Sequence, residues 1–206
     1  MRTVARMAVM ALAVALAASA CRGAAPQQLT EQQARLAEQI RKEIVTLPDY
    51  SLFDNLSYLF EDGGSTVVLR GQVAKPTLKK STERVVQRLE GVEKVVNEIE
   101  VLPNSPNDEQ VRAGVYVRVY GHPTLSRYNP NRGTPLFSST ARRSFGISSD
   151  PPPGRHPIHI IVKNANVTLE GVVDTEGDKT IAGLQANSTP GAFSVTNNLV
   201  VRKAGE

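Results

Sequence analysis

Thr66-Val67-Val68-Leu69-Arg70-Gly71 has a counterpart in Asn166-Val167-Thr168-Leu169-Glu170-Gly171, one hundred residues later. A second pair of matching stretches follows at the same offset, Gly91 to Ile99 and Gly191 to Leu199. Because the offset is equal at both places, the two stretches have the same separation in each copy. Similar spacing with altered side chains is typical of two copies of one supersecondary unit. We therefore predict that the chain contains a tandem repeat.

Each copy opens with a pattern that predicts a β-strand. Val67, Leu69 and Val73 alternate with other residues in the first copy, and their counterparts do so in the second. A period of two with β-branched residues indicates a strand with one buried face. Gly71 interrupts that face, as Gly171 does in the second copy. A glycine there indicates a bulge or the close approach of another backbone.

A helix and a further strand are predicted to follow. The range Pro76 to Glu90 places its apolar residues on one helical stripe, and proline suits the first turn. Gly91 fits a left-handed cap just beyond the helix. Ile99 and Val101 then alternate with acidic residues, which predicts a strand. The corresponding helix of the second copy is expected to be short or frayed, because four residues weaken it: Gly183, Asn187, Ser188 and Thr189.

The segment before each pair of strands predicts a helix. Thr30 and Gln33 have the spacing of a capping box, and an apolar stripe runs from Leu36 to Leu47. In the second copy, valines recur every four residues from Val111 to Val119. The stretch Val115 to Tyr120 also alternates like a strand, and the repeat favours the helix.

Each copy resembles the BON domain in the order of its motifs. These motifs are a V-x-L-x-G strand, a helix with lysine near its start (Lys79, Lys179), a glycine and the pattern V-x-N-x-[IL]-x-V. This domain occurs in bacterial envelope proteins, such as OsmY-like and DolP-like proteins, often in tandem pairs. The resemblance implies an α+β fold of two α-β-β-α-β sandwiches, each with a three-stranded mixed sheet and two helices. It assigns residues 30–103 to BON domain 1 and 107–202 to BON domain 2. Because the linker Pro103–Pro106 is short and stiff, we expect the domains to touch.

Residues 1–20 have the features of a signal peptide: two arginines, then an apolar stretch too short to span a bilayer. Cys21, the only cysteine, follows small residues at a cleavage point and resembles the cysteine of a bacterial lipobox. The resemblance implies a diacylated lipid anchor, a tether at 21–29 and a lipoprotein at the periplasmic face of the outer membrane. Ala18 replaces the usual leucine, which leaves ordinary cleavage and a soluble periplasmic protein open as the alternative.

Residues 121–154 form an insertion that the first copy lacks. The insertion contains six prolines, and long connections of this kind are usually flexible or functional. We predict a flexible segment. Its arginines, with one just beyond it, are candidate contacts for a partner protein: Arg127, Arg132, Arg142, Arg143 and Arg155.

No set of residues indicates catalysis or metal binding. His156 and His159 are too close together on an extended segment to converge on one metal ion, and no carboxylate or cysteine is near. The sequence has no nucleophile elbow and no glycine-rich phosphate loop. The predicted signal peptide and the lack of a Gly-x-x-Gly loop disfavour nucleic-acid binding. We therefore expect a protein that is not an enzyme, with no cofactor, no metal and no small-molecule substrate.

The most specific functional signal is a group of basic residues on the predicted helix of the first copy: Lys75, Lys79, Lys80, Arg84 and Arg88. The last three are spaced at four and therefore share one side of the helix. Such a face is compatible with simple solvation or with binding of anionic phospholipid headgroups. Each basic residue near an anionic membrane contributes roughly 1 kcal/mol.

Two functional hypotheses follow. In the first, the chain is a non-enzymatic, membrane-tethered envelope protein whose paired BON domains bind anionic phospholipid and support envelope integrity or osmotic stress tolerance. The resemblance implies most of this. In the second, the chain is a protein-interaction module that docks an outer-membrane or cell-wall partner through the arginine-rich insertion. The net charge of +4 does not separate the hypotheses, because Arg2 and Arg6 contribute two of these charges.

Overall fold

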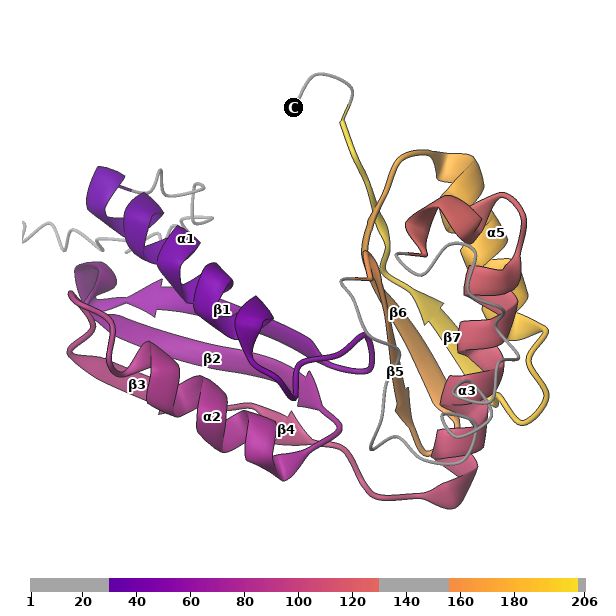
Figure 1. Cartoon of the computed structure of the whole chain (residues 1–206), viewed down its shortest axis with the longest axis horizontal. Coiled ribbons are helices and arrows are strands. Elements are labelled where there is room, and N and C mark those ends of the chain that lie inside the picture. Colours follow the sequence, from indigo (N-terminus) through magenta and orange to yellow (C-terminus); the bar gives the residue numbers. More distant parts are fainter. Residues whose placement is uncertain (1–29, 130–155, 204–206) are drawn as a thin grey trace, which may run out of the picture.

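The computed structural model describes residues 30–129 and 156–203, which form two α+β domains side by side (Figure 1). The elements of domain 1 are α1 (Glu31–Thr46), β1 (Asn55–Glu61), η1 (Asp62–Gly64), β2 (Thr66–Val73), α2 (Pro76–Val86), β3 (Lys94–Asn97) and β4 (Glu100–Val101). The elements of domain 2 are α3 (Pro106–Gly121), η2 (Leu125–Tyr128), β5 (Ile158–Lys163), β6 (Asn166–Val173), α5 (Glu176–Asn187), β7 (Ser194–Asn197) and β8 (Val200–Val201).

Each domain contains a mixed sheet with the same topology. In domain 1, β2 pairs antiparallel with β1 and parallel with both β3 and β4. The segments β3 and β4 lie in line beside β2, so they are two parts of one interrupted strand. In domain 2, β6 pairs in the same way with β5, β7 and β8. The predicted α+β fold of two tandem units is confirmed.

A glycine allows the first two strands of each domain to approach closely. Gly71 has a φ of +118°, and a Cβ atom there would lie 1.9 Å from the carbonyl oxygen of Asn55. Gly171 has a φ of +124°, and its Cβ atom would lie 2.0 Å from the carbonyl oxygen of Pro157. Any side chain would therefore clash with backbone and would also occupy an unfavourable backbone conformation. The predicted close approach of a second backbone is confirmed at both positions.

An asparagine connects the second helix of each domain to the interrupted strand. The side-chain amide of Asn97 donates to the carbonyl of Lys79 (3.2 Å), and its Oδ1 accepts from the N–H of Ile99 (3.2 Å). Asn197 makes the same two bonds, to Lys179 (2.7 Å) and Leu199 (3.3 Å). One side chain thus satisfies a helix carbonyl and an amide at the break in the strand, which explains why the repeat carries asparagine in both copies.

The helices agree with the sequence patterns except at two places. α1 begins with the predicted capping box, and the valine-rich stretch of the second copy is helical, as α3. α2 ends at Val86, four residues before the predicted end at Glu90.

The expectation of a short or frayed second helix in domain 2 is wrong, because α5 has 12 residues and α2 has 11. Thr175 and Asp178 form a capping box at its start, which satisfies amides that a helix end leaves open. Gly183 lowers helix propensity but leaves room for Asn197, whose Nδ2 would lie 2.8 Å from an added Cβ. Capping and packing therefore outweigh propensity here.

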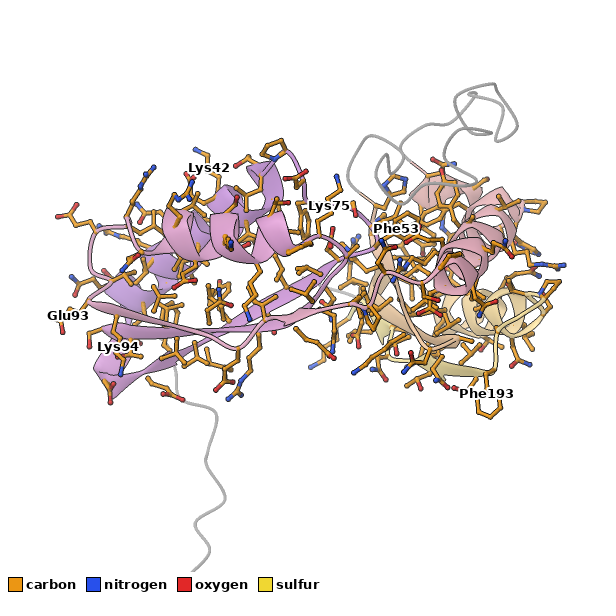
Figure 2. All side chains as sticks on the ribbon, turned by 90° about the horizontal axis from the view of Figure 1, so that it is seen from below. Lys42, Phe53, Lys75, Glu93, Lys94 and Phe193 are labelled. Carbon is orange, nitrogen blue, oxygen red and sulfur yellow. The ribbon has the colours of Figure 1, made fainter. Side chains whose placement is uncertain are left out.

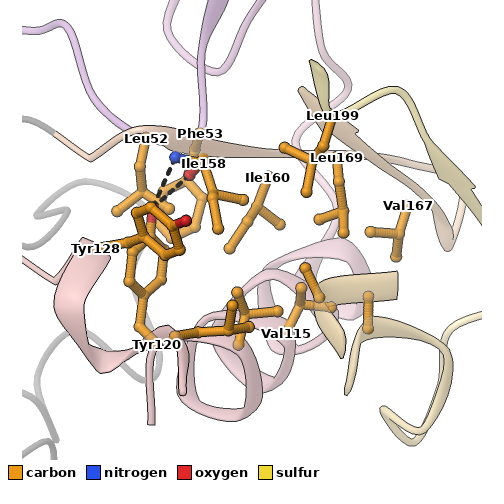
Figure 3. Close-up of a cluster of buried hydrophobic side chains, with 14 of the residues drawn as sticks. Leu52, Phe53, Val115, Tyr120, Tyr128, Ile158, Ile160, Val167, Leu169 and Leu199 are labelled. Atoms are coloured by element: carbon orange, nitrogen blue, oxygen red, sulfur yellow. Dashed lines mark hydrogen bonds between the residues drawn. The ribbon is translucent and has the colours of Figure 1, made fainter. Parts of the chain in front are cut away.

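The hydrophobic core of domain 2 contains two residues of domain 1. Leu52 and Phe53 lie in the loop between α1 and β1, and their side chains are only 2% and 6% exposed. Both belong to the buried cluster that includes Ile158 and Ile160 (Figure 3). The core of domain 1 is built from its own residues on α1, β2 and α2. Domain 1 therefore completes the core of domain 2.

Polar contacts hold this junction, which we call the seam (residues 50–54 against β5). The N–H of Ile160 donates to the carbonyl of Leu52 (2.8 Å), so the loop adds to the edge of β5. The rings of Tyr50 and His159 are 5.8 Å apart. Figure 2 shows Phe53 at the junction of the two domains. The expectation that the domains touch is met through this loop as well as through the linker.

The first part of the predicted flexible insertion is ordered. Residues 121–129 end α3 and form η2, where Leu125 and Tyr128 are buried in the core of domain 2. The prediction of flexibility from residue 121 is therefore wrong for these residues, because large apolar side chains fix them. The rest of the insertion, 130–155, lies outside the described residues, as do the predicted signal peptide, the tether and Cys21.

Candidate functional site

The basic residues of α2 lie opposite its buried stripe. Leu78, Thr82 and Val86 are buried against the core of domain 1. Lys80 and Arg84 each follow one of these residues by two positions, which is about 200° around an α-helix. Both side chains are therefore exposed, as is Arg88 in the turn that follows the helix. We call these three residues the basic row.

The basic row has no ion-pair partner among the described residues. Glu83, the acidic residue inside α2, accepts a hydrogen bond from the side-chain amide of Asn97 (2.9 Å). Its carboxylate is thus directed to the sheet side of the helix. The row can therefore attract an anionic surface.

The other two predicted residues differ from the row. Lys75 precedes α2, and its Nζ lies 3.1 Å from Oδ1 of Asp49. Thr77 also donates to that carboxylate (3.2 Å), so Asp49 holds the start of α2. Lys79 is partly buried beside the contact of its carbonyl with Asn97. The structure therefore places three of the five predicted lysines and arginines on the outward side of α2 and of the turn that follows it.

Arg127 is engaged within domain 2. Its guanidinium pairs with the carboxylates of Asp178 and of Asp174, the latter at 3.5 Å, and lies 5.0 Å from the ring centre of Tyr128. Burial works against a charged Asp178, but hydrogen bonds from Thr175 and Tyr128 and the charge of Arg127 outweigh it, so the pKa of Asp178 is lowered. Arg127 thus fastens η2 to the start of α5. The remaining predicted partner contacts, Arg132, Arg142, Arg143 and Arg155, lie outside the described ranges.

The basic row is not repeated in domain 2. At the equivalent positions α5 carries Thr180 and Leu184, and Ser188 follows the helix. Leu184 is 62% exposed, so this surface has neither the charge nor the solvation of α2. The two domains share one fold, but the outward faces of their second helices differ in charge.

The described histidines do not form a metal site. His156 is buried beside the ring of Tyr120, with ring centres 5.0 Å apart, and His159 packs in the seam. Burial lowers the pKa of His159. Hydrogen bonds to the backbone of Asp54 and Ser51 raise it, but by less than burial lowers it. Among residues 30–129 and 156–203, no group of three metal-binding side chains comes together.

Comparison with known proteins identifies the repeat. The profile of the BON domain matches residues 32–103 and 146–203, which together are more than half of the chain. The chain belongs to the BON domain family. BON domains are known for association with membranes and phospholipid in envelope proteins, and the family is generally non-catalytic. The second match begins after α3, so α3 and η2 belong to the part of domain 2 that the family profile leaves uncovered.

Two solved structures show a distant similarity to the chain. Both are of CdsD, a structural protein of the type III secretion system of Chlamydia trachomatis. The first, its C-terminal domain, is 14% identical with a TM-score of 0.27, covering 82% of this chain and 98% of that one. The second is 15% identical with a TM-score of 0.26, covering 83% and 94%. No curated protein matches the chain.

Within the described residues, no helix has the length and apolarity needed to cross a bilayer.

Sequence reasoning missed the seam. Leu52 and Phe53 lie between the predicted helix that ends at Leu47 and the predicted strand at Thr66, and no local pattern indicates that they pack in the other domain. Their size was the available hint, because two adjacent large apolar residues in a short loop need a core to cover them. Asn97 and Asn197 were part of the repeated pattern, but the pattern alone does not show which backbone groups they bind.

Proposed function

We propose that this BON protein is a non-enzymatic, membrane-tethered envelope protein that binds anionic phospholipid through the basic row of domain 1. The observation that carries the proposal is the exposure of Lys80, Arg84 and Arg88 without a carboxylate partner. Near an anionic membrane three such residues contribute roughly 3 kcal/mol in total, which is weak binding by itself. The function that we propose for this contact is support of envelope integrity or osmotic stress tolerance.

A lipid anchor at Cys21 would make this weak binding sufficient. Two acyl chains hold a protein stably on a membrane, whereas one chain does not. Tethering raises the local concentration of the basic row at the headgroups, so a modest contact becomes largely occupied. On this proposal the protein lies at the periplasmic face of the outer membrane. The mass of the mature N-terminal peptide tests this step, because an unmodified Cys21 would mean a soluble periplasmic protein.

Vesicle co-sedimentation tests the proposed surface. We expect the exported chain with Cys21→Ser to bind vesicles rich in anionic phospholipid more than neutral ones, and to lose this binding as salt rises. The triple variant K80Q/R84Q/R88Q should abolish the difference. The matched control is T180E/L184E/S188E, which lowers the net charge by the same three units at the equivalent positions of domain 2. If both variants weaken binding equally, net charge and not the basic row is responsible.

The arginine-rich insertion supports a second proposal, docking of an envelope protein. Arg127 is already paired with Asp174 and Asp178, so the proposal rests on Arg132, Arg142, Arg143 and Arg155. Deletion of residues 130–155 separates the two functions. Vesicle binding should survive the deletion if the basic row binds lipid, and a partner captured by the whole protein should be lost if the insertion docks it.

A further inference from the structure

A groove of about 1200 Å³ lies between the two domains. One wall comes from domain 1 and includes Arg41 and Ile44 of α1 and Leu56 of β1. The other wall comes from domain 2 and includes Val172 of β6 and Val200 of β8. The seam borders the groove, because Tyr50, Leu52 and His159 are also among its lining residues.

The domain 2 wall exposes a pair of valines. Val172 and Val200 are direct partners in the parallel pairing of β6 with β8, and their side chains are 43% and 61% exposed. Their counterparts in domain 1 are Gln72 and Glu100, which are also direct partners. An outward sheet position tolerates polar residues, as domain 1 shows. The fold therefore does not require valine at these two positions. An exposed pair of apolar side chains of this kind indicates a contact surface.

The rim of the groove is positively charged. Its charged lining residues in the described part of the chain are Arg41, Arg202 and Lys203, and none of the described residues that line it has a carboxylate. Arg41 and Lys203 form no ion pair with any other described residue, and Arg202 lies 3.3 Å from Asp174 with 62% of its side chain exposed. A ligand that places carboxylates at the rim and apolar groups on the valines would complement both features.

We propose that this groove docks an extended acidic peptide segment of another protein. Apolar side chains of the segment would cover Val172 and Val200, and its carboxylates would meet Arg41, Arg202 and Lys203. The volume exceeds the roughly 300–1,000 Å³ of typical small-molecule pockets, and those pockets enclose most of their ligand. Val200 is open to solvent, so a single acyl chain here would stay partly in water. In an extended segment with alternating polar and apolar side chains, the polar side chains all point to one face, which can stay in contact with water while the apolar face covers the valines.

The seam makes this site preformed. Leu52 and Phe53 are fixed in the core of domain 2, and the bond from Ile160 to Leu52 holds the loop against β5. The two walls therefore cannot separate without opening a core. Binding of a segment therefore requires little ordering of the groove, and little affinity is lost to that entropic cost.

Fluorescence anisotropy with a defined probe tests the proposal. The probe is a labelled eight-residue peptide of alternating glutamate and valine, and the matched control peptide replaces glutamate by lysine. We expect the Cys21→Ser chain to bind the acidic peptide with an affinity that falls as salt rises, and not to bind the basic one. Val200→Asp should weaken binding roughly tenfold, because it removes an apolar contact and adds a repelling charge. Leu184→Asp adds the same charge at an equally exposed residue outside the groove and should have no effect.

Three outcomes of these binding measurements would contradict peptide docking. Equal affinity for both peptides, absence of binding, or equal effects of Val200→Asp and Leu184→Asp would overturn the proposal. Loss of vesicle binding in Val200→Asp, with no peptide binding, would assign the groove to lipid instead. The variant K80Q/R84Q/R88Q should leave peptide binding intact, so failure of the phospholipid proposal and failure of this one are distinguishable.

Discussion

α2 and α5 occupy the same place in two copies of one unit, yet they resemble each other only where they touch the sheet. Both begin after a bend that follows the central strand, and a carbonyl of each accepts a hydrogen bond from an asparagine of the adjacent strand. On the outer side, Lys80 and Arg84 of α2 correspond to Thr180 and Leu184 of α5. The comparison separates residues that the fold requires from residues that are free to take up a function.

The same contrast appears where each helix begins. In domain 1, Oδ1 of Asp54 accepts the N–H of Ala74 (2.7 Å). In domain 2, the hydroxyl of Tyr128 accepts the N–H of the equivalent residue, Asp174 (2.7 Å). The two acceptors come from different elements, a loop before β1 and the ordered start of the insertion. The backbone group must be satisfied in both copies, and the means differ.

Substitution of the strand glycine should have the largest effect and should be equal in the two copies. Gly71→Ala and Gly171→Ala are each expected to cost about 4 kcal/mol or more, because the new Cβ meets a backbone carbonyl and not a movable side chain. Urea denaturation monitored by circular dichroism measures this cost. Gly91→Ala is the control, with a φ of +91° but no atom within 4 Å of the added Cβ, and should cost about 1 kcal/mol. A similar cost for all three would mean that backbone conformation, and not the clash, decides.

Truncation of Leu52 should break the symmetry between the copies. Leu52→Ala is expected to cost about 3 kcal/mol, because it opens a cavity in a core. The loss of amide protection should appear in β5 and β6, although the substitution is in domain 1. Leu59→Ala, at a residue of β1 that is 44% exposed, should change stability by less than about 0.5 kcal/mol. Earlier loss of protection in β2 than in β6 would contradict the assignment of Leu52 to domain 2.

Removal of the Tyr128 hydroxyl should have a smaller effect, confined to domain 2. Tyr128→Phe loses the bond from the N–H of Asp174 and the bond to Asp178 (2.9 Å), at a cost of about 1–2 kcal/mol. Asp54→Ala is the counterpart in domain 1. Because the two sites share no partner, their costs should add in the double variant, as thermal unfolding can show. A cost only in Asp54→Ala would show that the two groups are not equivalent.

The pH dependence of the seam should give the smallest effect. Burial lowers the pKa of His159 below its ordinary value of 6.5, so the folded chain favours the neutral ring. The contribution of this group to stability is therefore complete above pH 6.5 and is lost as the pH falls below that value. His159→Asn should reduce the slope of stability against pH between 5 and 7. An unchanged slope would show that other groups govern this window.

Much of the fold could be predicted because its signals are local. Alternation around Val67 and Leu69, the capping box at Thr30 and the repeated glycines each predicted the element that the structure contains. The prediction that α5 is short or frayed was wrong because helix propensity was weighed without the capping box of Thr175 and Asp178 and the packing of Asn197 at Gly183. The sequence placed a group of basic residues near α2, but only the burial of Leu78 and Thr82 shows which of them face outward, and their role in binding stays a prediction.

The missing parts depend on contacts between distant residues. Leu52 and Ile160 are joined by a hydrogen bond across the domain boundary, and no periodicity links them. The groove likewise exists only because two outward faces are held opposite each other. Val172 and Val200 look unremarkable in the sequence, since valine is common in strands. Their significance comes from comparison with Gln72 and Glu100.

The position of Leu52 and Phe53 separates the unit of duplication from the unit of folding. The repeat divides the chain near Pro103, but Leu52 and Phe53 join the halves through the core of domain 2 as well. Proteolysis between residues 103 and 106 would leave two fragments that remain associated through a shared interior. The C-terminal half would reach its final packing only once the N-terminal half presents its loop.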